Sequence, residues 1–207
     1  MVMNHPLQAH DLLWGMRPHM LADNVPDWVI QVLSEHKPVV VRRAVTKMHI
    51  VAVGIRGEQR NLRFATEMPV EAIVKKVSPE NLIDKDLALF PHLQHKLQAI
   101  HQTMQSFSLP WGYTGSVGYE LATGLKTVTE NSDVDVLIRT VQMLSKADAH
   151  SMLIALEHLG IQIDVQLQTP LGGVALREWA RSTGSVLLKS SDSAALVKNP
   201  WSAEECI

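Results

Sequence analysis

The residues with the clearest chemical potential in this sequence are three aspartates and a Gly-Ser pair. Asp133 and Asp135 alternate with apolar residues in the run SDVDVLI, which predicts a strand with both carboxylates on one face. Two carboxylates held side by side repel each other unless a cation lies between them. Oxygen ligands of this kind suit Mg²⁺, which keeps several waters and bridges substrate phosphates. The pair therefore predicts a magnesium site.

The Gly-Ser pair, Gly115 and Ser116, precedes a short predicted helix from Val117 to Ala122. The first backbone N–H groups of a helix and the positive end of its dipole favour a bound anion. Glycine at the turn would let the backbone approach a phosphate closely. We therefore expect these two residues to bind substrate phosphates.

The third aspartate, Asp164, lies in the alternating run IQIDVQL and shares a strand face with Gln162 and Gln166. The segment before it reads as a helix, with Ser145 as its N-cap and Gly160 as its C-terminal stop. Such a helix is long enough to cross a sheet and to return the chain to a neighbouring strand. The pattern predicts that Asp164 lies beside the Asp-x-Asp pair.

Together these features resemble the active site of the nucleotidyltransferase superfamily that includes DNA polymerase beta. In that family a Gly-Ser turn holds the nucleotide phosphates, and three carboxylates bind metal and orient the attacking hydroxyl. The resemblance implies that Asp133, Asp135 and Asp164 are catalytic and metal-binding. The simpler interpretation, that the aspartates are exposed strand or loop residues, is less favoured, because carboxylates are unfavourable on a strand.

Composition limits the classes of protein that remain. The 207 residues suffice for one large domain or two small ones, and 19 Lys and Arg against 21 Asp and Glu give a net charge of -2. Bulk charge thus offers no argument for nucleic acid as a partner. A single cysteine, Cys206, excludes an internal disulfide. With no apolar run of membrane length and no signal-peptide pattern, we expect a cytoplasmic protein without a membrane partner.

The order of the predicted elements indicates an α/β (α+β) fold in two parts. A helix beginning at Pro26 and strands over Pro38–Ala44 and His49–Gly57 predict a small N-terminal α/β unit, which we place at residues 1–80 because Ser78-Pro79 looks like a boundary. Residues 81–207 should form the nucleotidyltransferase domain, a mixed sheet flanked by helices. Its last strand is predicted at Ser185–Ser190.

Five arginines of the N-terminal unit form a second candidate site. Arg56, Arg60 and Arg63 recur at helical spacing, and Arg42 and Arg43 are near them in the sequence. If that stretch is helical, the first three share one face. They are either a solvated basic face or an anion clamp, for substrate phosphates or for an acidic partner protein, since arginine presents a bidentate fork to such groups.

The order of several phrases is similar to a narrower family over nearly the whole length. These phrases are HDLLW, PVVVRRA, VAVGIRG, WGYTGSVGYELATG, SDVDVLIR, DVQLQTPLGGVALREWAR and NPW. They resemble the phosphoribosyl-dephospho-CoA transferases of malonate decarboxylase, which are the holo-acyl-carrier-protein synthases of that system. The resemblance implies transfer from 2'-(5''-triphosphoribosyl)-3'-dephospho-CoA to a serine of the decarboxylase's acyl carrier protein subunit, with pyrophosphate as the leaving group.

The same resemblance implies a role for each candidate residue. Asp133 and Asp135 would bind Mg²⁺, Asp164 would hold a second metal or accept the serine proton, and the Gly-Ser turn would hold the donor's triphosphate. The carboxylates alone do not distinguish this reaction from that of an adenylyltransferase using ATP. A noncatalytic subunit of a decarboxylase complex is a third interpretation, which the complete set of carboxylates disfavours.

Overall fold

The structure, a computed structural model, describes residues 6–59, 61–129 and 132–202. The chain divides into two compact units, Met1–Ser78 and Pro79–Ile207. Helices and two sheets, one of them mixed, make the fold α+β, as the sequence predicts. None of the helices in the described ranges is long and apolar enough to cross a membrane.

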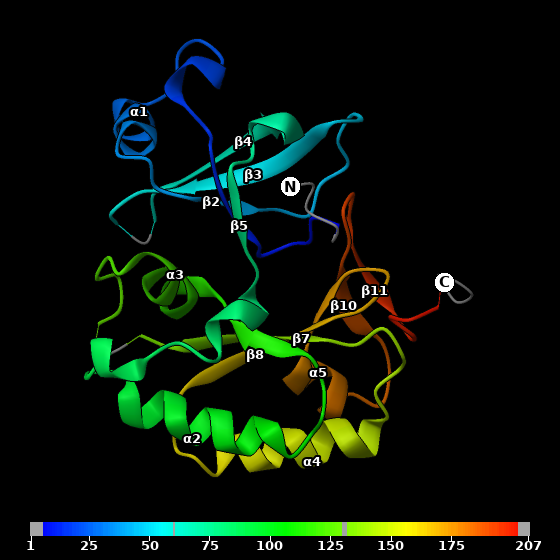
Figure 1. Cartoon of the computed structure of the whole chain (residues 1–207). Coiled ribbons are helices and arrows are strands. Elements are labelled where there is room, and N and C mark those ends of the chain that lie inside the picture. Colours follow the sequence, from blue (N-terminus) through cyan, green and yellow to red (C-terminus); the bar gives the residue numbers. More distant parts are fainter. Residues whose placement is uncertain (1–5, 60, 130–131, 203–207) are drawn as a thin grey trace. The chain divides into compact units, whose positions relative to one another are not determined.

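The N-terminal unit contains an antiparallel sheet, with five strands among the described residues in the order β4-β3-β2-β1-β5 (Figure 1). Its elements are β1 (Leu12–Trp14), η1 (Pro18–Met20), α1 (Asp27–Ser34), β2 (Val39–Val41), β3 (Ile50–Arg56), β4 (Arg63–Pro69), η2 (Val70–Ala72) and β5 (Lys75–Val77).

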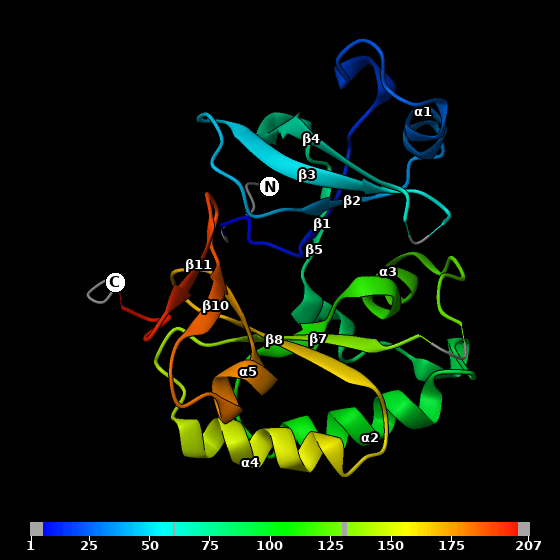
Figure 2. The same ribbon diagram turned by 180° about the vertical axis from the view of Figure 1, so that it is seen from behind.

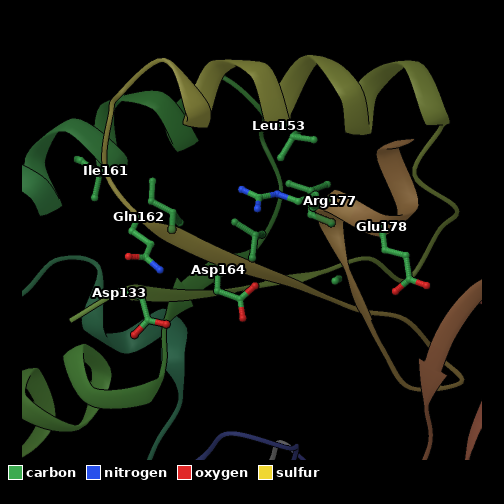
Figure 3. Close-up of a pocket in the computed structure, with 11 residues that line it drawn as sticks. Asp133, Leu153, Ile161, Gln162, Asp164, Arg177 and Glu178 are labelled. Carbon is green, nitrogen blue, oxygen red and sulfur yellow. The ribbon is translucent and has the colours of Figure 1, made fainter. Parts of the chain in front are cut away.

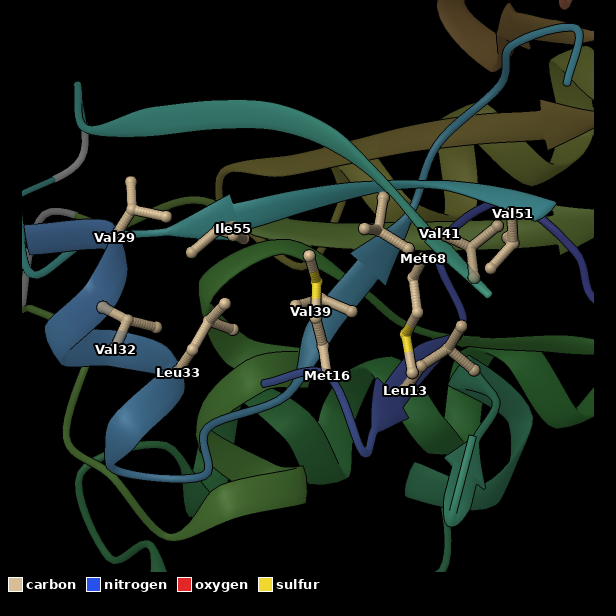
Figure 4. Packing of buried hydrophobic residues seen from close by; sticks show 11 residues of the cluster. Leu13, Met16, Val29, Val32, Leu33, Val39, Val41, Val51, Ile55 and Met68 are labelled. Atoms are coloured by element: carbon tan, nitrogen blue, oxygen red, sulfur yellow. The ribbon is translucent and has the colours of Figure 1, made fainter. Parts of the chain in front are cut away.

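The core of this unit lies between α1 and one face of the sheet. Pro26 is the N-cap of α1, and Val29, Val32 and Leu33 are buried at helical spacing. They pack with alternate residues of the strands, among them Ile55 of β3 (Figure 4). Because side chains alternate along a strand, the even-numbered residues of β3 lie on the opposite face.

The segment from Arg56 to Arg63 is a β-hairpin connection, so the helical interpretation of its arginine spacing is wrong. β3 ends at Arg56 and β4 begins at Arg63, and these two residues are register partners. The backbone N–H of Gly57 donates to Leu62 O at 3.0 Å, which closes the turn. Arg56 and Arg63 are seven residues apart, a spacing that fits two turns of a helix as well as the two paired ends of a hairpin.

The C-terminal unit has a mixed sheet, with six strands among the described residues in the order β11-β10-β9-β8-β7-β6. Its elements are η3 (Pro79–Leu82), η4 (Leu87–Leu89), α2 (Gln94–Gln105), β6 (Trp111–Tyr113), α3 (Gly115–Thr123), β7 (Val134–Arg139), α4 (Lys146–Glu157), β8 (Ile163–Gln168), β9 (Gly173–Ala175), α5 (Leu176–Arg181), β10 (Val186–Lys189) and β11 (Ala194–Val197). Helix α3 lies on one face of this sheet, and α2 and α4 lie on the other (Figures 1 and 2).

Helix α4 is the crossover that makes β7 and β8 parallel neighbours. The hydroxyl of Ser145 accepts a hydrogen bond from the Asp148 backbone N–H at 3.0 Å, so the predicted N-cap is confirmed. Ala149, Met152 and Leu156 are buried beneath the sheet. The helix thus returns the chain to the starting edge of β7, where β8 begins.

The end of the chain adds a strand that the sequence did not predict. β10 is followed by β11, which pairs with it antiparallel, so β10 is not the last strand. The turn between them is closed by the Ser190 N–H donating to Ser193 O at 2.9 Å and by the Ser190 hydroxyl contacting Asp192. Serine and aspartate side chains supply such local turn contacts. The run SSDS therefore looks like the end of the sheet in the sequence, although β11 follows it.

Candidate active site

The parallel pairing of β7 and β8 brings the predicted aspartates together. Asp135 is the register partner of Asp164, and paired residues of neighbouring strands project to the same face. Asp133 lies one residue before β7 begins at Val134. Figure 3 shows the Asp133 and Asp164 side chains on the same side of the two strands. The structure therefore places three carboxylates on one short stretch of sheet.

The Gly-Ser turn is built directly onto this stretch. Helix α3 begins at Gly115, earlier than the predicted start at Val117, and the Thr114 backbone N–H donates to Asp135 O at 2.9 Å. Gly115 has a φ of +60°, and a Cβ atom there would lie 1.7 Å from Asp135 Oδ2. The Asp135 carboxylate therefore packs directly against Gly115, the first residue of α3, where the positive dipole end of the helix stabilises negative charge.

The carboxylates fit a magnesium ion that is shared with a substrate better than a closed protein cage. Within the described ranges, no three His, Cys, Asp or Glu side chains form a group that could hold a metal by themselves. Mg²⁺ in phosphate-transferring sites is commonly held by one or two carboxylates, with waters and substrate phosphates completing its shell. The predicted metal role of Asp133, Asp135 and Asp164 stays a prediction that this arrangement accommodates.

A pocket of about 490 Å³ opens beside the carboxylates (Figure 3). It forms because β9 pairs with β8 only from Gln166 onwards, which leaves the first half of β8 facing the start of α5. Its polar lining residues are Asp133, Gln162, Asp164, Arg177 and Glu178, and its apolar lining includes Leu153, Ile161, Val165 and Leu176. The pocket combines an apolar wall with charged groups of both signs.

Arg177 is a site residue that the sequence analysis missed. It is the one cation among the described residues that line the pocket. Its side chain is 62% exposed, and Nη2 lies 3.5 Å from Glu157 Oε1. An exposed ion pair of this kind contributes little to folding stability, so the guanidinium can turn toward an anion at a small cost in free energy. Only the pairing of β8 with β9 and α5 reveals its position, and no local motif signals it.

Three of the predicted arginines share the sheet face opposite the core of the N-terminal unit. Arg56 and Arg63 are register partners, and the side chain of Arg42 lies against Gly54, with Cδ 3.2 Å from where a Cβ would be. Arg42 and Arg63 are exposed, whereas Arg56 is buried.

The other two predicted arginines, Arg43 and Arg60, are not assigned to this face. Arg43 Nη2 lies 3.3 Å from His10 Nε2, so this side chain has a partner within the unit. Arg60 lies outside the described residues. Arg42, Arg56 and Arg63 therefore form a group on one face of the sheet and not a helical face, with Arg56 and Arg63 in strands and Arg42 directly after β2. The function of this group stays a prediction.

Both units of the chain match models of known protein families. The family model for the phosphoribosyl-dephospho-CoA transferase MdcG N-terminal domain matches residues 8–79, and the model for the C-terminal domain of the same enzyme matches residues 81–200. No solved structure matches the chain. Both units thus match parts of one kind of enzyme, and the chain is a transferase.

Relatives named phosphoribosyl-dephospho-CoA transferase match almost end to end. The protein of Pseudomonas fluorescens strain Pf0-1 is 42% identical over 204 residues, which cover 99% of this chain and 98% of the relative. The protein of Pseudomonas putida strain W619 is 45% identical over 199 residues, covering 96% and 97%. That of Pseudomonas putida strain GB-1 is 43% identical over 203 residues, covering 98% of each. The chain belongs to the phosphoribosyl-dephospho-CoA transferase family.

Proposed function

We propose that this protein transfers the 2'-(5''-phosphoribosyl)-3'-dephospho-CoA group from its triphosphate precursor to a serine of the malonate decarboxylase acyl carrier protein. The observation that carries the proposal is the register pairing of Asp135 with Asp164, beside the Gly115 turn, in a chain of this family. This arrangement can hold a reacting phosphate between carboxylates and a helix N-terminus. Residues of this kind act on phosphoryl groups mainly by positioning and electrostatics.

In the proposed reaction, the serine oxygen attacks the α-phosphorus of the 5''-triphosphate. A new phosphodiester bond forms as the bond to the bridging oxygen breaks, and pyrophosphate leaves with that electron pair. Asp164, which is exposed on β8, would accept the serine proton, or it would hold a second metal while the proton passes to solvent water. A magnesium ion bound by Asp133 and Asp135 would neutralise charge on the reacting phosphates. Gly115 and Ser116 hold the triphosphate.

The test of this proposal is intact mass spectrometry of the apo carrier protein after incubation with the protein, Mg²⁺ and the triphosphoribosyl donor. A mass gain on a carrier serine, with pyrophosphate release and with loss of the gain in Asp133→Asn, is the expected result. ATP as a parallel donor tests the adenylyltransferase alternative. No gain with either donor would overturn the proposal and favour a noncatalytic role, whereas unchanged modification by Asp133→Asn would remove Asp133 from the catalytic site.

Arg177 supports binding of an anionic donor in the pocket beside the carboxylates. We expect Arg177→Gln to raise the donor concentration for half-maximal rate about three- to tenfold, because an exposed charge-assisted hydrogen bond contributes modestly. Steady-state rates at varied donor concentration measure this. Arg181→Gln is the matched control, since Arg181 lies on the same helix and contacts the same Glu157 but does not line the pocket. Equal effects of the two changes would contradict the assignment.

The exposed arginines of the N-terminal sheet, Arg42 and Arg63, suit an acidic surface of the carrier protein. We expect the double variant Arg42→Gln, Arg63→Gln to raise the carrier concentration for half-maximal rate about three- to tenfold at low salt and less at high salt, because interfacial charges act mainly on association. The donor requirement should not change. Lys47→Gln, which removes one exposed charge from the turn before β3, is the control. A rise in the donor requirement would instead assign these arginines to the donor.

A further inference from the structure

Glu120 is a buried carboxylate in the middle of α3, the helix that begins with the Gly-Ser turn. Its side chain is 3% exposed, and Oε2 accepts hydrogen bonds from the backbone N–H groups of Thr127 and Val128, both at 2.8 Å. The other oxygen, Oε1, lies 3.0 Å from Nε2 of His92, which precedes α2. One carboxylate therefore joins three segments of the C-terminal unit.

The segment that Glu120 holds connects the two halves of the candidate active site. After α3 ends at its C-cap Gly124, the chain folds back along the helix. The Thr127 hydroxyl donates to the carbonyl oxygen of Ser116 at 2.9 Å, which is a second tie to the first turn of α3. Further along, the Ser132 backbone N–H donates to Thr129 O at 3.0 Å, directly before Asp133.

A carboxylate at this depth is costly unless hydrogen bonds compensate for its lost hydration. Two backbone N–H groups and an imidazole supply that compensation, and in return the carboxylate satisfies two N–H groups that a buried loop would otherwise leave without an acceptor. An apolar side chain could fill the same space but could not fix the direction of the loop. A hydrogen-bond acceptor is therefore needed at this position to fix the orientation of the loop against the helix.

We propose that Glu120 is a positioning residue, which holds Thr127 and Val128 against α3 and thereby keeps Asp133 in place beside the Gly115–Ser116 turn. The catalytic part of this inference rests on the proposed function, in which Asp133 and the turn act on the same phosphates. Glu120 acts through the backbone and not on the donor. Its loss should therefore reduce the rate of the bound complex and leave the affinity for the donor nearly unchanged.

The test compares three variants in the full-length protein. Glu120→Met keeps the length and approximate volume of the side chain but offers no acceptor oxygen to the two N–H groups, and we expect kcat to fall about ten- to hundredfold, since misplacement by about 1 Å costs that much. The donor KM should change less than about twofold, because no contact to the donor is lost. Thr127→Val, which removes only the tie to Ser116, should lower kcat less and in the same direction. His92→Gln removes an exposed partner and should leave kcat within about twofold.

Hydrogen exchange provides a readout that does not depend on transfer activity. The amides of Thr127 and Val128 should exchange faster in Glu120→Met than in the wild-type protein and His92→Gln, whereas the amides of β7 should not. If the wild-type protein transfers nothing, the proposed function fails while the exchange result still tests whether Glu120 holds the loop. Unchanged exchange in Glu120→Met, or a lowered unfolding midpoint with an unchanged kcat in both Glu120→Met and Thr127→Val, would overturn the inference.

Discussion

The Asp135→Asn protein should catalyse transfer at least about a hundredfold more slowly than the wild-type protein, since removal of one preorganised electrostatic group costs about that much. Asparagine preserves the shape of the side chain but removes the charge that lies between the N-terminus of α3 and Asp164. Initial rates of carrier modification, measured by intact mass, report the change. Asp84→Asn, which neutralises an exposed aspartate of the same unit, should retain the wild-type rate.

The dependence of the rate on Mg²⁺ separates metal binding from other roles of this carboxylate. If Asp135 is a metal ligand, the Asn variant should need several times more Mg²⁺ for half of its own maximal rate, and an excess of chelator should abolish activity in the wild-type protein. A proton acceptor would instead leave the Mg²⁺ requirement unchanged. Asp164→Asn, studied in the same way, assigns one of these two roles to Asp164. A wild-type rate in Asp135→Asn would contradict the proposed site.

Local patterns in the sequence predicted how the aspartates of the C-terminal unit are arranged, because this arrangement depends on the two-residue period of the strands. Alternation in SDVDVLI and IQIDVQL indicates which face each aspartate occupies, and a helix between two strands makes parallel neighbours. The register that pairs Asp135 with Asp164 then follows from two strands of similar length beginning at the same edge. The pairing of Asp135 with Asp164 could therefore be predicted without knowledge of other tertiary contacts.

Features that depend on distant pairings were not predictable in this way. The spacing of Arg56 and Arg63 suits a helix as well as a hairpin, and only pairing of β3 with β4 decides between them. The position of Arg177 in the pocket depends on where β9 leaves β8. Glu120 looks like an ordinary helix residue in the phrase GYELATG, and its burial emerges only when the following loop folds back onto α3. Each of these positions is set by tertiary contacts.

Gly115→Ala should abolish most of the activity with only a modest loss of stability. An alanine Cβ would lie 1.7 Å from Asp135 Oδ2, so the carboxylate or the turn must move, and misplacement of this size costs about a hundredfold in rate. Gly124→Ala is the matched control, because Gly124 caps the other end of the same helix at φ +74° and no atom lies within 4 Å of its added Cβ. Each change places a non-glycine residue in the left-handed region and should lower the free energy of unfolding, measured with urea, by about 1–2 kcal/mol.

The comparison of these two glycines separates backbone strain from displacement of the carboxylate. Because the strain is similar at φ +60° and +74°, similar losses of stability with activity lost only in Gly115→Ala would show that the space above the turn is reserved for Asp135. Equal losses of activity would instead mean that α3 tolerates no strain at either end, and the contact would carry no special weight. Full activity in Gly115→Ala would contradict the close approach itself. The carboxylate's position against the helix N-terminus would then have no bearing on transfer.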